Sequence, residues 1–191
     1  MNRAIILHGM PSKELYYDIL AQDSQSNSHW LPWLQQRLCQ NNILSQTPEM
    51  PVPFQPNYIA WKNEFDRFLP DNNTLLVGHS CGAGFIIRWL SENPNRIVGK
   101  VVLVAPWIDI EGEYPEMFNF VISSDINKQV TGGIDVIYST DDQKSTLSTV
   151  EKLRQSINGL NYHEFSNYGH FTIGRMKTRE FPELLQICLN K

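Results

Sequence analysis

Residues 75–84 read LLVGHSCGAG and place Ser80 in the middle of a G-x-S-x-G pattern. The apolar residues before it predict a strand over 74–77, and those after it predict a helix that begins near Cys81. A serine on the sharp turn between strand and helix projects its hydroxyl free of the sheet, where it can attack a carbonyl carbon. Gly78 and Gly82 allow strand and helix to approach closely. The helix turns its free N–H groups towards the position where an oxyanion would form.

A base and an acid for this serine follow later in the chain. A serine hydroxyl is a weak nucleophile until a base removes its proton, and an acidic partner must hold that base in the correct tautomer. Asp142 follows a predicted strand over 134–139, and His170 follows another over 160–165. The order Ser80, Asp142, His170 is the chain order of one known type of catalytic triad. We therefore predict that Ser80 is the nucleophile, His170 the base and Asp142 the acid.

The identity of the acid has alternatives. Asp141 and Asp142 are adjacent, so only one of them can point at His170. Asp141 is expected to fix the turn through backbone hydrogen bonds. Asp109, which follows a predicted strand over 101–105, is a third candidate, because triads are recognised by geometry and not by position.

An oxyanion hole needs two N–H donors. The backbone N–H of Cys81 is the first, and the loop after the first strand supplies the second, from Met10 or Gly9. The Cys81 thiol is interpreted as a small buried side chain and not as a nucleophile. Residues expected to line the substrate pocket are His8, Gly9, Trp30 and Trp107.

Strands and helices alternate along the chain. Strands are predicted over 3–8, 43–47, 74–77, 101–105, 134–139 and 160–165, and helices over 30–40, 58–69, from Cys81, 146–157 and 178–189. This alternation predicts a three-layer α/β/α sandwich around a mostly parallel sheet of about six strands. Ligands of such sheets bind beyond the carboxyl ends of the strands. The candidates that follow predicted strands are His8, Gly9, Ser80, Asp141, Asp142 and His170.

Residues 107–131 are too few for a large cap domain. They carry aromatic and acidic residues, with no basic residue before Lys128. Two interpretations have equal weight: a surface excursion whose aromatic residues cover the end of the sheet, or a small lid over an apolar pocket. An acidic lid would repel polyanionic substrates such as coenzyme A thioesters.

Composition excludes several classes of protein. The chain has 191 residues, 41% hydrophobic and 19% charged, with a net charge of −4, which indicates one globular domain over 1–191. The sequence has no cluster of Lys and Arg, so nucleic acid is not an expected partner. No apolar run approaches the roughly 20 residues of a membrane span. Cys39, Cys81 and Cys188 lack metal-type spacing, so no metal site is expected. Reduced cysteines and the missing signal-peptide core favour a cytoplasmic location.

Together these motifs resemble those of small α/β-hydrolases of the retinoblastoma-binding-protein-9 and YdeN type. The resemblance covers nearly the whole chain. It rests on residues 5–9 (IILHG), 29–34 (HWLPWL), 50–53 (MPVP), Trp61, 78–82 (GHSCG), 102–105 (VLVA), 139–142 (STDD) and 169–171 (GHF).

The resemblance implies a compact α/β-hydrolase fold and a serine hydrolase without metal or organic cofactor. It also implies a triad of Ser80, Asp142 and His170, because the second of two adjacent aspartates is usually the acid in this family. There is one departure: the family's acid loop commonly continues as D-P-x-x-P, whereas residues 142–146 read DQKST.

The predicted activity is hydrolysis of a small carboxylic ester, or of an amide, through an acyl-Ser80 intermediate. The expected partner is a small-molecule ester or acyl substrate. One alternative is a catalytically silent module that binds another protein, since a fold does not dictate function. Another is transfer of the acyl group to an acceptor other than water, because the two reactions share the acyl-enzyme.

Overall fold

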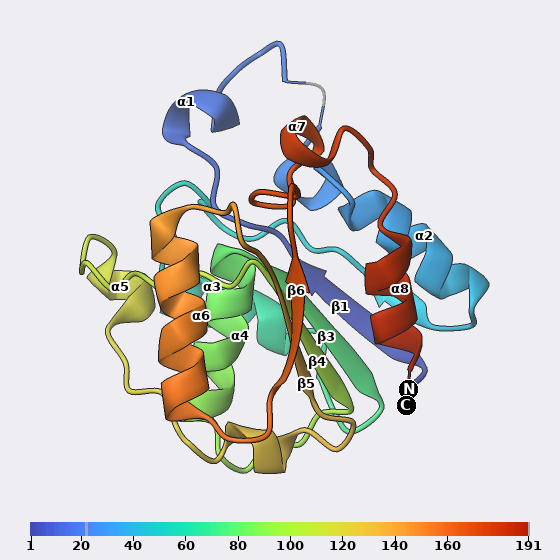
Figure 1. The fold of residues 1–191 in the computed structure, drawn as a ribbon, viewed down its shortest axis with the longest axis vertical. Coiled ribbons are helices and arrows are strands. Elements are labelled where there is room, and N and C mark those ends of the chain that lie inside the picture. Colours follow the sequence, from blue (N-terminus) through green and yellow to red (C-terminus); the bar gives the residue numbers. More distant parts are fainter. Residues whose placement is uncertain (22, 191) are drawn as a thin grey trace.

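The fold is built around a parallel sheet of six strands. In the structure, a computed structural model that describes residues 1–21 and 23–190, the strand order is β2-β1-β3-β4-β5-β6, and every neighbouring pair is parallel (Figure 1). The strands are β1 (Arg3–Leu7), β2 (Leu44–Gln46), β3 (Thr74–His79), β4 (Lys100–Val104), β5 (Ile134–Ser139) and β6 (Asn161–Phe165). The predicted fold class is confirmed, and the sheet is wholly parallel within the described residues.

Helices cover both faces of the sheet. The longer helices are α2 (Leu31–Gln40), α3 (Tyr58–Asp66), α4 (Cys81–Glu92), α6 (Lys144–Ser156) and α8 (Pro182–Leu189). Helices α3, α4 and α6 pack on one face, and α2 and α8 pack on the other (Figure 1). Shorter helical turns are α1 (Lys13–Tyr16), η1 (Gln25–Asn27), α5 (Pro115–Phe118), η2 (Ile126–Gln129) and α7 (Ile173–Met176).

Two hydrophobic cores lie between these layers. Alternate residues of β3 show the division: Leu76 packs in the core of α3, α4 and α6, whereas Leu75 and Val77 pack in the core of α2 and α8. All six residues of β3 are buried, as are all those of β4 and β5. Burial on both faces explains why these strands appear in the sequence as continuous apolar runs.

Several predicted boundaries are wrong. The helix predicted over 178–189 begins at Pro182, because proline fits the first helical position and Phe181 before it is not helical. The helix predicted over 58–69 ends at Asp66, and Leu69 has a φ of 48°. The other predicted elements agree with the structure to within two residues at each end. The exposed or very short helices α1, α5 and α7 were not predicted.

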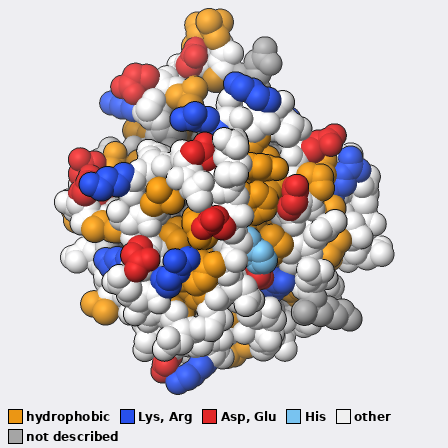
Figure 2. Space-filling model, in the orientation of Figure 1, with side chains coloured by type: hydrophobic (Ala, Val, Ile, Leu, Met, Phe, Trp, Pro, Cys, Tyr) orange, Lys and Arg blue, Asp and Glu red, His pale blue; other side chains and the backbone are white. Residues whose placement is uncertain are grey.

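One face of the molecule is mixed in charge. On the face drawn in Figure 2, Lys and Arg side chains are scattered among Asp and Glu, with small hydrophobic areas between them. None of the helices described is both long and apolar enough to cross a lipid bilayer.

Candidate active site

Ser80 sits on a strained turn between β3 and α4. Its φ of 54° and ψ of −118° lie in a region that residues with a Cβ rarely adopt. The surrounding backbone fixes this conformation: Ser80 N–H donates to the carbonyl of Val104 at 2.9 Å. A Cβ on Gly82 would lie 2.5 Å from the carbonyl oxygen of His8, so only glycine fits there. The turn therefore holds the Ser80 hydroxyl at the carboxyl end of the sheet.

The structure brings Ser80, His170 and Asp142 into one hydrogen-bonded row. Ser80 Oγ is 2.8 Å from His170 Nε2, and His170 Nδ1 is 2.9 Å and 3.1 Å from the two carboxylate oxygens of Asp142. A carboxylate can only accept, so Nδ1 carries the proton and Nε2 is free to accept from the serine hydroxyl. The Asp142 side chain is fully buried, whereas His170 is partly exposed and, with Ser80, lines a cavity.

The other two acid candidates have different partners. Asp141 Oδ1 accepts from the Ser139 hydroxyl at 2.5 Å and from Gly169 N–H at 3.2 Å. The Ser139 hydrogen bond, with help from Gly169, lowers the pKa of Asp141. The Asp109 carboxylate accepts from the N–H groups of Gly112 and Tyr114, at 3.0 and 2.5 Å. Both residues organise loops, and the structure joins neither of them to His170.

The two residues predicted to supply the oxyanion N–H groups, Cys81 and Met10, lie beside Ser80: Cys81 follows it in the chain, and Met10 lines the same cavity. Cys81 is the first residue of α4, and the first N–H groups of a helix have no partner within it. On the other side, Gly9 lies so close to Ser80 that a Cβ on it would be 3.1 Å from the serine Cβ. His8 Nδ1–H donates to the Gly9 carbonyl at 2.8 Å. The Gly9–Met10 peptide is planar and trans, so the N–H of Met10 points away from His8.

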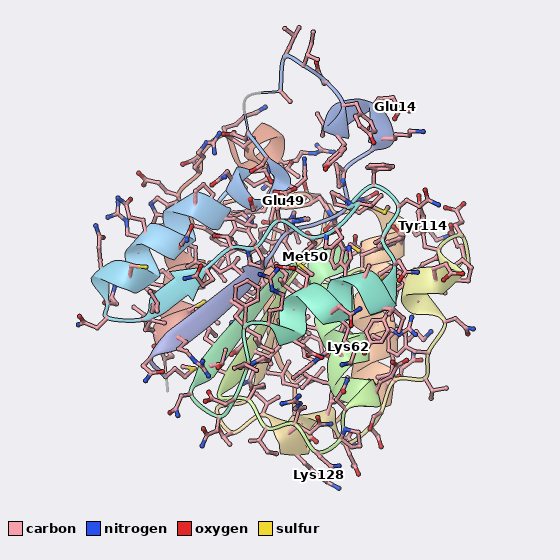
Figure 3. All side chains as sticks on the ribbon, turned by 180° about the vertical axis from the view of Figure 1, so that it is seen from behind. Glu14, Glu49, Met50, Lys62, Tyr114 and Lys128 are labelled. Carbon is pink, nitrogen blue, oxygen red and sulfur yellow. The ribbon has the colours of Figure 1, made fainter. Side chains whose placement is uncertain are left out.

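A cavity of about 410 Å³ opens beside Ser80 and His170. Its walls include Met10, Trp107, Ile110, Tyr114, Gln143, Ser145 and Ser148. Four charged residues, Asp109, Glu111, Glu113 and Lys144, also line it. Three carboxylates against one ammonium make the cavity acidic. Tyr114 lies at the edge of the molecule beside α5 (Figure 3).

Two residues predicted for the pocket lie in the interior instead. Trp30 is fully buried at the start of α2, where its ring packs against Phe181 and His79. His8 is also fully buried, and its Nε2 accepts from the N–H of Met50, which lies in the segment between β2 and α3 (Figure 3). These aromatic rings fill the two hydrophobic cores, so neither reaches the cavity.

Of the other two residues predicted for the pocket, Gly9 and Trp107, only Trp107 lines the cavity. Gly9 packs against Ser80 but is not part of the cavity wall, whereas Trp107 is. Trp107 is held in place because its N–H donates to the carbonyl of Ser80 at 3.2 Å. Its ring also packs edge-to-face on Tyr114 and Phe118. The first part of segment 107–131 is therefore anchored to the turn that carries Ser80.

The sequence did not predict several cavity residues or the contact between His79 and the backbone of His170. Lys144, Ser145 and Ser148 come from the start of α6, directly after Asp142. Their position beyond a strand end was the signal that could have identified them. His79 Nε2 lies 2.9 Å from the carbonyl oxygen of His170, a contact that no spacing indicates.

The Cys81 side chain is fully buried, and burial raises the pKa of its thiol far above the usual value. In residues 1–21 and 23–190, no three His, Cys, Asp or Glu side chains gather in a way that would hold a metal ion.

Comparisons with known proteins agree with one another. A family model described as "Serine hydrolase" matches residues 21–184. The chain is 29% identical over 161 residues to a protein named "Putative hydrolase YdeN" from Bacillus subtilis (strain 168), covering 81% of this chain and 84% of that one.

Solved structures share the fold. The crystal structure of the ydeN gene product from B. subtilis superposes with a TM-score of 0.79 at 24% identity, covering 98% of this chain and 96% of the other. An esterase from Exiguobacterium antarcticum gives a TM-score of 0.64 at 14% identity, covering 98% and 92%. A monoacylglycerol lipase from Paleococcus ferrophilus gives 0.64 at 11% identity, covering 97% and 93%.

Proposed function

This chain belongs to the serine hydrolase family, and from that premise we propose that it cleaves a small carboxylic ester, or an amide, through an acyl intermediate on Ser80. The observation that carries the proposal is the hydrogen-bonded row from Ser80 Oγ through His170 to the buried Asp142 carboxylate. This row contains a nucleophile, a base within reach of its proton, and an acid that orients the base.

The first half of the reaction forms the acyl-enzyme. His170 Nε2 takes the proton of the Ser80 hydroxyl as Oγ attacks the carbonyl carbon of the substrate. The negative charge that develops on the carbonyl oxygen is stabilised by the N–H groups of Cys81 and Met10. The bond to the leaving group then breaks, and His170 returns its proton to the leaving oxygen or nitrogen. Asp142 stabilises the imidazolium while it carries the proton.

The second half of the reaction releases the carboxylic acid product from Ser80. A water molecule gives a proton to His170 and attacks the acyl carbon. The bond between that carbon and Ser80 Oγ then breaks, and His170 passes its proton to Oγ, which restores the Ser80 hydroxyl. The cavity beside Ser80 has a volume of about 410 Å³, at the lower end of the range of small-molecule sites. This volume supports a small substrate. We further propose that the first residues of segment 107–131 form a fixed wall of the cavity, anchored by the hydrogen bond from Trp107 to Ser80.

Labelling with a fluorophosphonate probe, followed by intact mass, tests this function. We expect one adduct on the wild type and none on Ser80→Ala. Ser156→Ala, which removes a hydroxyl at the far end of α6, is the matched control and should label like the wild type. No adduct on a folded wild type would overturn the proposal and favour the protein-binding alternative. Product analysis with added alcohols then separates hydrolysis from acyl transfer.

A further inference from the structure

His79 is the last residue of β3 and precedes Ser80 in the chain. Its ring is 2% exposed and is surrounded by other rings. The centroids of His29, Trp30 and His170 lie 5.7, 5.6 and 5.2 Å from that of His79. His79 is absent from the cavity wall, so it does not reach the space where a substrate would lie.

The hydrogen bond of His79 fixes its tautomer. Nε2 lies 2.9 Å from the backbone carbonyl oxygen of His170, and a carbonyl can only accept, so Nε2 carries a proton. Nδ1 is buried and has no hydrogen-bond partner among the described residues. Burial lowers the pKa of His79 well below its usual value, and the neighbouring His170, His29 and His8 rings add to this effect. A neutral ring with one donor, at Nε2, satisfies these conditions.

The chain around His170 needs such an anchor. Gly169 and Phe171, on either side of His170, both have positive φ, at 51° and 53°. The Ser139 hydroxyl at the end of β5, and Asp141 and Asp142 on the loop after it, also accept hydrogen bonds from this loop. These three contacts fix the base relative to β5, and none of them reaches β3. The hydrogen bond from His79 joins the backbone of the base directly to the strand that carries Ser80.

We propose that His79 is a positioning residue whose Nε2–H, bound to the carbonyl of His170, sets the distance between Ser80 Oγ and His170 Nε2. This inference rests on the proposed function, because it assigns a role to that distance. The competing explanation is that the ring only fills space beside Trp30. A displacement of about 1 Å in a catalytic group costs on the order of 100-fold in rate, so the two explanations differ measurably.

Two substitutions separate the donor from the ring. His79→Phe keeps the ring volume and removes the donor, whereas His79→Gln can place an amide N–H near the position of Nε2. For hydrolysis of a p-nitrophenyl ester by His79→Phe, we expect kcat to fall about 10- to 100-fold, with KM within about two-fold of the wild type. His79→Gln should recover kcat to within about five-fold. The fluorophosphonate labelling rate should follow the same order.

His163→Phe is the matched control. It removes another histidine hydrogen bond, which joins His163 Nε2 to Asp135 Oδ1 at 2.8 Å. Asp135 lies near the start of β5, at the amino end of the sheet and away from Ser80. This control should lower Tm while kcat stays near the wild-type value. If folded His79→Phe keeps its kcat, or if His79→Gln is as impaired as His79→Phe, the inference is overturned.

A second measurement needs neither folding of a variant nor activity. ¹⁵N NMR of the histidine rings in the wild type at pH 7 should show His79 neutral with its proton on Nε2. A proton on Nδ1, or a charged ring, would overturn the inference even if Ser80 reacts with the probe. Failure of the probe to react with Ser80, with the expected tautomer in place, would overturn the proposed function instead.

Discussion

Asp141 and Asp142 are neighbours in the chain, yet their carboxylates bind different parts of the base loop. Asp142 accepts from the ring of His170 at 2.9 Å, whereas Asp141 accepts from the backbone N–H of Gly169 at 3.2 Å. Asp142 is buried behind the ring. One aspartate therefore orients the imidazole, and the other fixes the backbone that carries it.

We expect Asp142→Asn to lower kcat by about 10⁴-fold, because an amide favours the wrong tautomer of His170. The measurement is steady-state hydrolysis of a p-nitrophenyl ester, with circular dichroism to verify the fold. Asp141→Asn is the matched control, and its kcat should fall far less. A loss of only a few fold in Asp142→Asn would contradict the assignment and transfer the acid role to Asp141 or Asp109.

The three cysteines should differ in reactivity. Cys39 is exposed, whereas burial raises the pKa of both Cys81 and Cys188. A thiolate is the reactive form, so a thiol reagent should modify Cys39 alone in the native protein and leave hydrolase activity intact. Mass spectrometry after iodoacetamide treatment measures this. Loss of activity in Cys39→Ser treated with the reagent would indicate that Cys81 takes part in the chemistry.

Stability should fall on acidification because of His29. Burial, followed by the charges of His170 and Arg179, lowers the pKa of His29 to about 4. The unfolded chain takes up a proton at about pH 6.5, so between pH 6.5 and 4 it binds a proton that the folded chain does not. The free energy of unfolding therefore decreases as pH falls through this window. Above pH 6.5 the ring is neutral in both states, and His29 no longer makes stability depend on pH.

His29→Gln tests the assignment to His29. The drop in Tm between pH 7.5 and pH 5 should be smaller in this variant than in the wild type, whatever its stability at pH 7.5. Thermal unfolding monitored at both pH values gives the comparison. Equal drops in the two proteins would show that other groups cause the acid sensitivity.

Gly84 marks the contact between α4 and the segment that follows β4. A Cβ at this position would lie 2.1 Å from the carbonyl oxygen of Trp107 and 2.7 Å from Phe118 Cε1. Gly84→Ala should therefore displace the wall of the cavity and reduce stability by about 1–3 kcal/mol. Urea unfolding measures the change. Gly174→Ala, where the nearest atom is 3.9 Å away, is the control, and comparable losses in both would refute the steric explanation.

The acidic cavity should select against anionic substrates. Asp109, Glu111 and Glu113 line it, opposed by Lys144 alone among the charged lining residues. A neutral butyrate ester should have a kcat/KM about 10-fold above that of the hemisuccinate ester of the same alcohol at low salt. The gap should narrow with added salt and in Glu111→Gln/Glu113→Gln. A preference for the hemisuccinate would contradict this expectation, as would efficient turnover of a coenzyme A thioester.

The main features of the fold could be predicted because they depend on local pattern. Continuous apolar runs identify strands that are buried on both faces, and the glycines around Ser80 identify the turn. The resemblance to the YdeN type is confirmed by the identity over most of the chain. The serine, the acid and the histidine each follow a strand, so their meeting at one edge of a parallel sheet could also be foreseen.

The pocket could not be predicted in the same way. Trp30 and His8 have residue types common in binding sites, but an aromatic ring in a sequence does not reveal whether it faces the core or a cavity. Here both face the core. The contact of His79 joins residues 91 positions apart, and only the three-dimensional structure brings them together. Helix α7 has four residues, too few to show a period.

The edge position of β6 has a consequence for cooperativity. Among the described residues, β6 pairs with β5 alone, and none of its five residues is fully buried, whereas β3 is buried throughout. Edge elements open with less free energy than the whole protein needs to unfold. Such an opening would withdraw the histidine while the serine stays on its turn. We therefore expect activity to disappear in mild denaturant before the circular dichroism signal does.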